Sequence, residues 1–217
     1  EVGGDYYDVF ALPDGRLAVV VGDVSGKGIQ AAFFMTLIKG HVRALSLSTR
    51  DPADVLRHLN RLFREQAPRG LFVTMIYGVL DPATRTFTLA RAGHPPVLHY
   101  RACTQQVQCL RPSGMGIGLA DAELFDEALE SCTLRLETGD RVLLYTDGIT
   151  EMAGATEERW GLERLQQWLV ESSQRGYAPE QALEALEEQL RAFAGTTELA
   201  DDLTAILLEV KQNGDAG

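Results

Sequence analysis

Three apolar stretches of the sequence carry aspartate at one end. They are residues 17–22, followed by Asp23; residues 141–145, followed by Thr146 and Asp147; and residues 203–210, preceded by Asp201 and Asp202. A single aspartate in such a place usually caps a turn. Several carboxylates gathered beside an apolar sheet repel each other, so one must be protonated or a cation must bind. Ligation by oxygen atoms alone favours Mg²⁺ or Mn²⁺ over zinc.

A fourth acidic site, Asp5 with Asp8 nearby, precedes the first of these stretches. Between this site and the next helix lies the glycine-rich segment 22–28. It has the spacing Gly-x-x-x-Gly-Lys-Gly, which is one residue short of a P-loop and lacks the Ser or Thr after Lys. The segment is therefore not interpreted as a nucleotide-binding loop.

The composition excludes several classes of partner. With 217 residues and 45% hydrophobic content, the chain is long enough for one domain with a sizeable core. Its net charge of −11 disfavours nucleic acids and anionic membranes, which need clustered Lys and Arg. No apolar run approaches the roughly 20 residues that span a bilayer, and because no basic segment precedes an apolar stretch, we expect no signal peptide in this sequence.

The ends and the cysteines add two expectations. The chain opens at Glu1 without Met, which suggests a domain of a longer protein with an upstream sensory or receiver domain. Cys103, Cys109 and Cys132 form no CxxC pair and have no His at zinc spacing, which favours reduced thiols in a cytoplasmic protein. We expect one catalytic domain over residues 1–211 and a disordered tail over 212–217.

The elements expected to position the carboxylates follow from periodicity and turn signals. Strands are predicted at 17–22, 72–80, 86–92, 95–100, 107–110, 127–136, 141–145 and 203–210, and helices at 28–47, 52–66, 162–173 and 179–194. Many antiparallel strands with helices in two blocks indicate an α+β fold. We expect a four-layer α-β-β-α sandwich, with two antiparallel sheets flanked by helices.

Some polar residues within these elements suggest no chemistry. In the helix 52–66, which starts after an Asp51-Pro52 cap signal, Asn60 and Arg61 are expected on the solvent side. His99 has no partner pattern and is interpreted as incidental. His94, between Gly93 and two prolines, is more often a structural turn residue than a ligand or an acid.

Five motifs occur in order along the chain. They are Gly3-Gly4-Asp5-Tyr6-Tyr7-Asp8, Gly22-Asp23-Val24-Ser25-Gly26-Lys27-Gly28, Ala92-Gly93-His94-Pro95-Pro96, Tyr145-Thr146-Asp147-Gly148-Ile149-Thr150-Glu151 and Asp201-Asp202-Leu203-Thr204. Together they resemble the bacterial sporulation and stress-response (SpoIIE/RsbU-like) branch of the PPM, or type 2C (PP2C), phosphatases, over roughly residues 1–210.

The resemblance implies two Mn²⁺ or Mg²⁺ ions held in a cleft. Asp23 would bridge both ions, with the backbone carbonyl of Val24 beside it. Asp147 and Asp201 would complete one metal site, and Asp5 would serve the other. The resemblance thus makes Asp23, Asp147 and Asp201 the catalytic residues, and Asp5, Asp23, Val24, Asp147 and Asp201 the metal ligands.

Two assignments within this set stay open. Asp5 is preferred to Asp8 because it belongs to the Gly-Gly-Asp element, although strand alternation puts the two on opposite faces. Asp202 stands where relatives often have Asn and is interpreted as an outer residue. His94 is expected to shape a loop near the cleft.

The sequence also departs from the eukaryotic members. Ser25 follows Asp23-Val24 where those relatives carry a His often described as the general acid, and nothing upstream of Gly3 supplies their phosphate-binding Arg. Lys27 is a candidate anchor for phosphate, although a solvated loop lysine is an equally good interpretation.

The function that the resemblance implies is hydrolysis of phosphoserine or phosphothreonine on a partner protein, expected to be an anti-sigma-factor antagonist. Two metal ions about 4 Å apart would activate a water for in-line attack, without a Cys or Ser nucleophile. The alternative is a catalytically silent module that keeps the fold for binding or sensing. A homodimer is possible, and the helices at 28–47 and 52–66 are hypothesised to be the regulatory element.

Overall fold

The computed structural model describes residues 4–26, 28–68, 70–154, 158–195 and 202–211. The chain forms two compact units, and each is described by itself. Unit 1 comprises residues 1–94 and 111–135, and unit 2 comprises residues 95–110 and 136–217. Asp201 and the expected tail at 212–217 lie outside the described residues, and the single domain over 1–211 stays a prediction.

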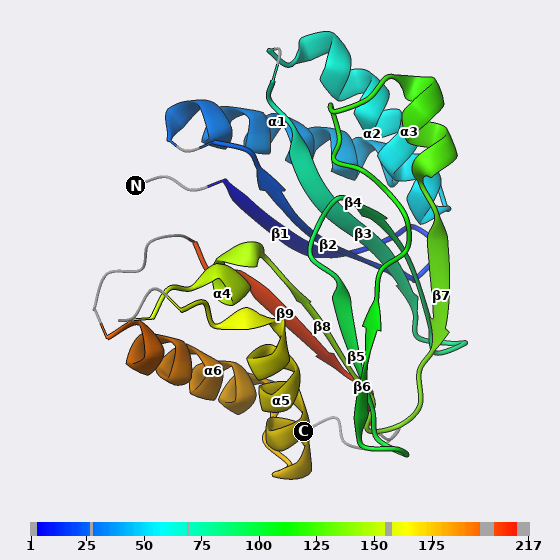
Figure 1. The fold of residues 1–217 in the computed structure, drawn as a ribbon. Helices are drawn as coiled ribbons and strands as arrows, with labels where there is room; N and C mark the ends of the chain where they lie inside the picture. Colours follow the sequence, from blue (N-terminus) through cyan, green and yellow to red (C-terminus); the bar gives the residue numbers. More distant parts are fainter. Residues whose placement is uncertain (1–3, 27, 69, 155–157, 196–201, 212–217) are drawn as a thin grey trace. The chain divides into compact units, whose positions relative to one another are not determined.

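Unit 1 is built on a five-stranded antiparallel sheet (Figure 1). Its strands, in spatial order, are β1 (Asp5–Ala11), β2 (Leu17–Val24), β3 (Val73–Asp81), β4 (Thr86–Ala92) and β7 (Ser131–Arg135). Its helices are α1 (Ile29–Leu45), α2 (Pro52–Gln66) and α3 (Ala122–Ala128). Helices α1 and α2 cover one face of the sheet, and α3 lies beside α2.

Strand alternation explains which face of this sheet the helices cover. Ala18 and Val20 of β2 lie opposite Val79 and Tyr77 of β3, and all four side chains are buried in one core with the apolar face of α1 and α2. Each fully buried side chain of this size stabilises the fold by about 1.5–3 kcal/mol. Because the side-chain period of a strand is two, the odd-numbered residues of β2 point to the opposite face.

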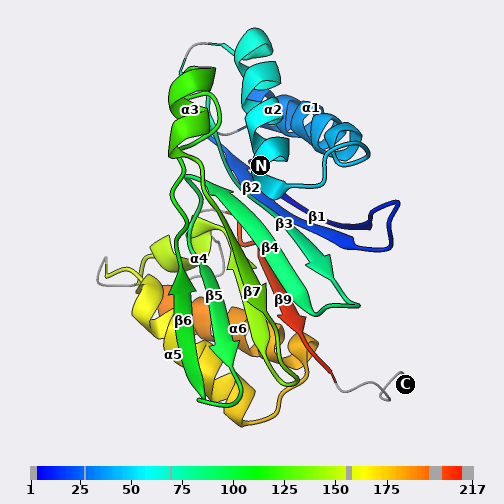
Figure 2. The same ribbon diagram turned by 90° about the vertical axis from the view of Figure 1, so that its right-hand side faces the viewer.

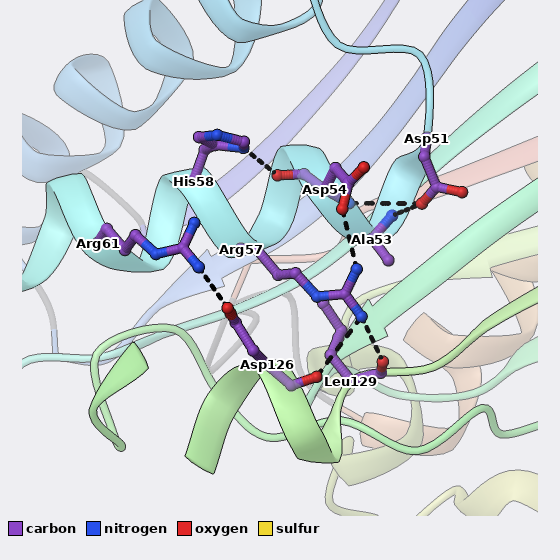
Figure 3. A network of polar contacts seen from close by, with 8 residues as sticks. All are labelled: Asp51, Ala53, Asp54, Arg57, His58, Arg61, Asp126 and Leu129. Carbon is purple, nitrogen blue, oxygen red and sulfur yellow. Dashed lines mark hydrogen bonds and ion pairs between the residues drawn. The ribbon is translucent and has the colours of Figure 1, made fainter. Parts of the chain in front are cut away.

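Arginines on α2 bind α3, as Figure 3 shows. Arg57 donates to the backbone carbonyls of Asp126 and Leu129, at 3.5 and 3.2 Å, and to the Asp54 carboxylate at 2.9 Å. Arg61 donates to the carboxylate of Asp126. The helix therefore holds the 126–129 segment through a row of side chains spaced one turn apart.

The predicted solvent exposure of α2 is wrong for Asn60. Its side chain is fully buried: Nδ2 donates to the carbonyl of Ala120 at 3.4 Å, and Oδ1 accepts from the amide of Gly118 at 2.8 Å. Arg61 is exposed, as expected. The amide side chain satisfies a loop that crosses α2, which is why a polar group is tolerated there.

The prediction of one strand over 127–136 is also only partly right. The segment begins as α3, whose N-terminus is capped by the Asp121 carboxylate accepting from the amide of Leu124 at 3.1 Å. Only residues 131–135 form a strand. A helix of seven residues offers too little apolar periodicity to stand out in a sequence.

Unit 2 is built on a four-stranded antiparallel sheet. Its strands, in spatial order, are β6 (Gln106–Leu110), β5 (Val97–Arg101), β8 (Arg141–Tyr145) and β9 (Ala205–Glu209), and its helices are α4 (Asp147–Glu151), α5 (Gly161–Gln174) and α6 (Pro179–Ala194). Helices α5 and α6 lie along one face of this sheet (Figure 2). Leu98, Leu143, Trp168 and Leu186 share the core between them.

The prediction of an α+β fold with two antiparallel sheets flanked by helices is thus confirmed. The helices at 52–66 and 179–194 begin and end at the expected residues. None of the described helices combines the length and the apolarity needed to cross a bilayer.

His99, which the sequence left without a role, belongs to a buried polar cluster around Asp140. His99 Nε2 donates to the Asp140 carboxylate at 3.0 Å, and both side chains are less than 5% exposed. The same carboxylate accepts from the amides of Ala102 at 2.9 Å and Glu137 at 3.0 Å. Asp140 therefore holds together the turn after β5 and the turn before β8.

We expect Asp140→Ala to lower the free energy of unfolding by about 3 kcal/mol, because one buried donor and two partly buried donors lose their acceptor. Urea unfolding followed by circular dichroism measures the loss. Asp121→Ala, which removes only the helix cap of α3, is the matched control and is expected to cost about 1 kcal/mol. Equal losses of unfolding free energy in the two variants would contradict the role of Asp140 as the shared acceptor of these three hydrogen bonds.

Candidate metal centre

Asp5 and Asp23 lie directly opposite each other across the antiparallel pair β1–β2. Directly opposite residues project from the same face, with Cβ atoms about 4.5–5.5 Å apart. Both side chains are partly exposed and stand on the face away from α1 and α2. Two ionised carboxylates at this spacing repel each other, and a bound cation is a common way in which proteins hold such a pair.

The atoms around this pair leave no space for a side chain at Gly4. An ideal Cβ on Gly4 would lie 2.7 Å from Asp23 Oδ1, 2.7 Å from the Val24 carbonyl oxygen and 3.5 Å from the Gly26 carbonyl oxygen. Oxygen atoms from three residues therefore converge beside the start of β1. Carboxylate and carbonyl oxygens are the ligands that Mg²⁺ and Mn²⁺ prefer, so the residues present fit such an ion.

The loop after Asp23 is held on both sides. The Val24 amide donates to the Gly4 carbonyl at 3.1 Å. The Ser25 amide donates to the Phe72 carbonyl at 2.9 Å, and the Phe72 amide donates back to the Ser25 hydroxyl at 3.0 Å. Ser25, which stands where eukaryotic relatives carry His, thus latches the loop onto the residue before β3.

Helix α1 starts directly after this loop. Gly26 and Gly28 have φ values of 92° and 81°, a region that glycine adopts without strain, and α1 begins at Ile29. Apart from the adjoining residues, no atom of the described part of the chain lies within 4 Å of a Cβ built on either residue, so conformation and not space requires glycine here. Lys27, the candidate phosphate anchor, lies outside the described residues.

Asp8 has a different partner from Asp5. Arg43 of α1 donates to both of its carboxylate oxygens at 2.7 Å, and the Tyr6 hydroxyl donates at 3.2 Å. The Arg43 guanidinium also stacks over the ring of Phe10, 3.8 Å from its centroid. Burial and the neighbouring Asp8 carboxylate raise the pKa of Tyr6 far above its usual value, so the hydroxyl keeps its proton. This geometry supports the choice of Asp5 over Asp8 as the ligand.

In unit 2, Asp147 is the first residue of α4 and is exposed. The buried Thr146 before it donates its amide to the Thr204 carbonyl at 3.0 Å, and the Thr204 amide donates to the Thr146 hydroxyl at 3.2 Å. A Cβ on Gly148 would lie 2.2 Å from the Asp202 carbonyl oxygen. These contacts hold the start of α4 against the segment 202–204.

The structure therefore brings together part of the predicted ligand set. Asp5, Asp23 and the carbonyl of Val24 meet in unit 1, and Asp147 stands at a strand end in unit 2. Asp201 falls among the residues that are not described. In the described part of the chain, no three His, Cys, Asp or Glu side chains form a group suited to a metal ion. The full set of five ligands stays a prediction.

Thr74 lies beside the acidic pair on the same face of the sheet, and no feature of the sequence predicts this position. It lies opposite Asp23 across β2–β3, so Asp5, Asp23 and Thr74 share one face of the sheet. Its hydroxyl oxygen lies 2.8 Å from Nδ1 of His94, whose side chain is 1% exposed. Thr74 sits in an ordinary apolar strand, and only the strand register reveals its neighbours.

The two sheets with their flanking helices have the fold of PP2C phosphatase domains. The SiaA-PP2C domain of Pseudomonas aeruginosa has a TM-score of 0.82, with 24% identity over 97% of this chain and 82% of that one. The structure of the RsbU and RsbW domains of Rv1364c from Mycobacterium tuberculosis has a TM-score of 0.77, with 27% identity, and covers 97% of this chain and 56% of that one.

The chain belongs to the SpoIIE family, because the family model "Stage II sporulation protein E (SpoIIE)" matches residues 13–211. The phosphoserine phosphatase RsbU of Bacillus subtilis is 31% identical over 215 residues, which are 97% of this chain and 60% of RsbU. The chain thus spans about 60% of the length of that relative. The resemblance inferred from the five motifs is confirmed.

We expect Gly4→Ala to weaken Mn²⁺ binding by about tenfold or more, because the added methyl group displaces Asp23 Oδ1 and the Val24 carbonyl. Calorimetric titration with MnCl₂ measures the affinity. Gly40→Ala in α1 is the matched control: outside the helix's own backbone, no atom of the described residues lies within 4 Å of the new Cβ, and affinity should not change. Wild-type affinity in Gly4→Ala would exclude these oxygens as ligands.

Substitution of Asp5 and substitution of Asp8 should affect different properties of the protein, the first its Mn²⁺ affinity and the second its stability. Asp5→Ala is expected to weaken Mn²⁺ binding with little loss of stability. Asp8→Ala is expected to lower the free energy of unfolding by about 1–2 kcal/mol, since a paired, partly exposed Arg43 loses a bidentate partner, while Mn²⁺ still binds. Calorimetry and thermal unfolding of both variants test this. Loss of Mn²⁺ binding in Asp8→Ala alone would reverse the assignment.

Proposed function

We propose that this chain is a metal-dependent protein serine/threonine phosphatase that hydrolyses phosphoserine or phosphothreonine on a regulatory partner protein. The observation that carries the proposal is the opposition of Asp5 and Asp23, with the Val24 carbonyl beside them at Gly4. Mg²⁺ and Mn²⁺ bind through oxygen ligands, and a pair of carboxylates beside a backbone carbonyl supplies them. Phosphoryl transfer needs little from the protein beyond positioning and electrostatic stabilisation.

Each ligand has a proposed role. Asp5, Asp23 and the Val24 carbonyl would hold Mn²⁺ or Mg²⁺ in unit 1, with Asp23 as the shared ligand, and Asp147 and Asp201 would be the further ligands that the family resemblance implies. When bound, a pair of such ions lowers the pKa of a water and orients the phosphoryl oxygens for in-line attack. The chain's own residues hold these ligands in place, and no Cys or Ser nucleophile is required.

The substrate class is supported by the relative with the printed name phosphoserine phosphatase RsbU, which aligns with 97% of this chain. We infer that the partner is an anti-sigma-factor antagonist carrying a phosphorylated serine or threonine. Hydrolysis of that phosphate would remove about 1.5 to 2 units of negative charge from the surface that the partner presents to its own binding protein.

The test is hydrolysis of p-nitrophenyl phosphate and a phosphoserine peptide with Mn²⁺, with Mg²⁺ or with EDTA. We expect activity that EDTA abolishes and that falls about 100-fold or more in Asp23→Ala and in Asp147→Ala, because each removes a metal ligand. Asp81→Ala, at the last residue of β3, is the matched control and should keep full activity, because the Asp81 carboxylate accepts only from the turn that follows the strand.

The outcomes separate the phosphatase from a silent binding module. Activity that persists with EDTA or in Asp23→Ala would exclude the two-metal mechanism. No activity on either substrate, with Mn²⁺ binding that depends on Asp23, would favour a silent module that keeps the fold. A phosphorylated antagonist protein then serves as the third substrate, and its turnover would identify the partner.

A further inference from the structure

The face of the unit 1 sheet that carries Asp5 and Asp23 continues through two more polar residues. Thr74 of β3 lies directly opposite Asp23, and Met75 next to it forms a bridge with Gly93, which precedes His94. The order across this face is therefore Asp5, Asp23, Thr74 and then His94. Thr74 Oγ1 and His94 Nδ1 lie 2.8 Å apart, which is a hydrogen-bonding distance. Either atom can be the donor, depending on the tautomer of His94.

His94 is fixed too tightly for a surface role. Its side chain is 1% exposed, and Arg91 donates to its backbone carbonyl at 2.8 Å and to the Pro112 carbonyl at 3.0 Å. Gly93 has a φ of 69°, and a Cβ there would lie 2.7 Å from the Gly116 amide nitrogen. A histidine buried in this way cannot meet a protein substrate directly, but its ring nitrogen contacts Thr74, which is paired with Asp23.

The chemistry of the row decides which atom donates. A threonine hydroxyl has one proton to give and two lone pairs, and the Asp23 carboxylate can only accept. If the Thr74 proton pointed to His94, only lone pairs of the hydroxyl would remain, and these could not bind the Asp23 carboxylate on the same face of the sheet. If His94 Nδ1–H donates to Thr74 instead, the hydroxyl proton is free to turn toward Asp23.

We propose that Thr74 and His94 are positioning residues for the bridging ligand: His94 Nδ1–H donates to the Thr74 hydroxyl, which donates to the Asp23 carboxylate and sets its orientation toward the metal. The proposal rests on the proposed function of Asp23 as a ligand. Outer hydrogen-bond partners of this kind orient metal ligands, and their loss typically weakens metal binding by about 10–100-fold.

The first test is Mn²⁺ affinity by calorimetry in variants of Thr74. Thr74→Val keeps the shape and removes the hydroxyl, and we expect affinity to fall about tenfold or more. Thr74→Ser keeps the hydroxyl and should stay within about threefold of wild type. Thr88→Val is the matched control, because Thr88 also makes a hydroxyl contact in this sheet, to Thr133 at 2.9 Å, yet belongs to β4 away from the row.

The comparison distinguishes failure of this proposal from failure of the proposed function. If wild type binds Mn²⁺ and Asp23→Ala does not, but Thr74→Val binds as wild type does, the positioning role is overturned and the phosphatase assignment stands. If wild type shows no Asp23-dependent Mn²⁺ binding, both are overturned. A tenfold loss of Mn²⁺ affinity in Thr74→Val, but not in Thr74→Ser or Thr88→Val, supports the positioning role of Thr74 and His94.

A second measurement needs no substitution at Thr74 and so survives a variant that does not fold. Nitrogen-15 spectra of the histidine side chains in the wild-type protein report which ring nitrogen of His94 carries the proton. The proposed hydrogen bond from His94 to Thr74 requires that His94 be protonated at Nδ1. The signals that disappear in His94→Asn are those of His94. A spectrum in which His94 is protonated only at Nε2 would make Nδ1 an acceptor and overturn the proposal.

Discussion

The opposition of Asp5 and Asp23 across β1 and β2 is the constraint on which unit 1 depends. Two carboxylates at this spacing repel each other, so the fold must hold them in place. The register does so: Ala18 and Val20 point into the core under α1 and α2, and this forces Asp23 to the other face. A slip of one residue would bury the carboxylates and expose the apolar set.

The first motif is thus one strand whose two faces have different tasks. Gly4 leaves room for oxygen atoms of the neighbouring strand, and Asp5 joins them. Tyr6 and Asp8 point the other way, and Asp8 binds Arg43 near the end of α1. The same helix starts just after the Asp23 loop, so α1 follows β2 in the chain at its start and is bound to β1 through Arg43 near its end.

Unit 2 uses polar contacts at both ends of β8. At the start of the strand, Asp140 collects three donors, among them His99. At its end, the reciprocal bonds between Thr146 and Thr204 position the turn into α4, where Asp147 stands. Hydrogen-bonded polar groups of this kind rigidify both ends of the strand, which a ligand at a strand end requires.

Local signals in the sequence were sufficient for the class of fold, for most strands and for the helices at 52–66 and 179–194, because capping and periodicity act within a few residues. The acidic residues of the candidate centre were also visible as types and motifs. Tertiary structure alone decided that Asp5 and not Asp8 faces Asp23, that Asn60 and His99 are buried, and that Thr74 joins the row. The partners of these residues come from other strands or loops of the chain, and register and packing, not local spacing, determine which side chains meet.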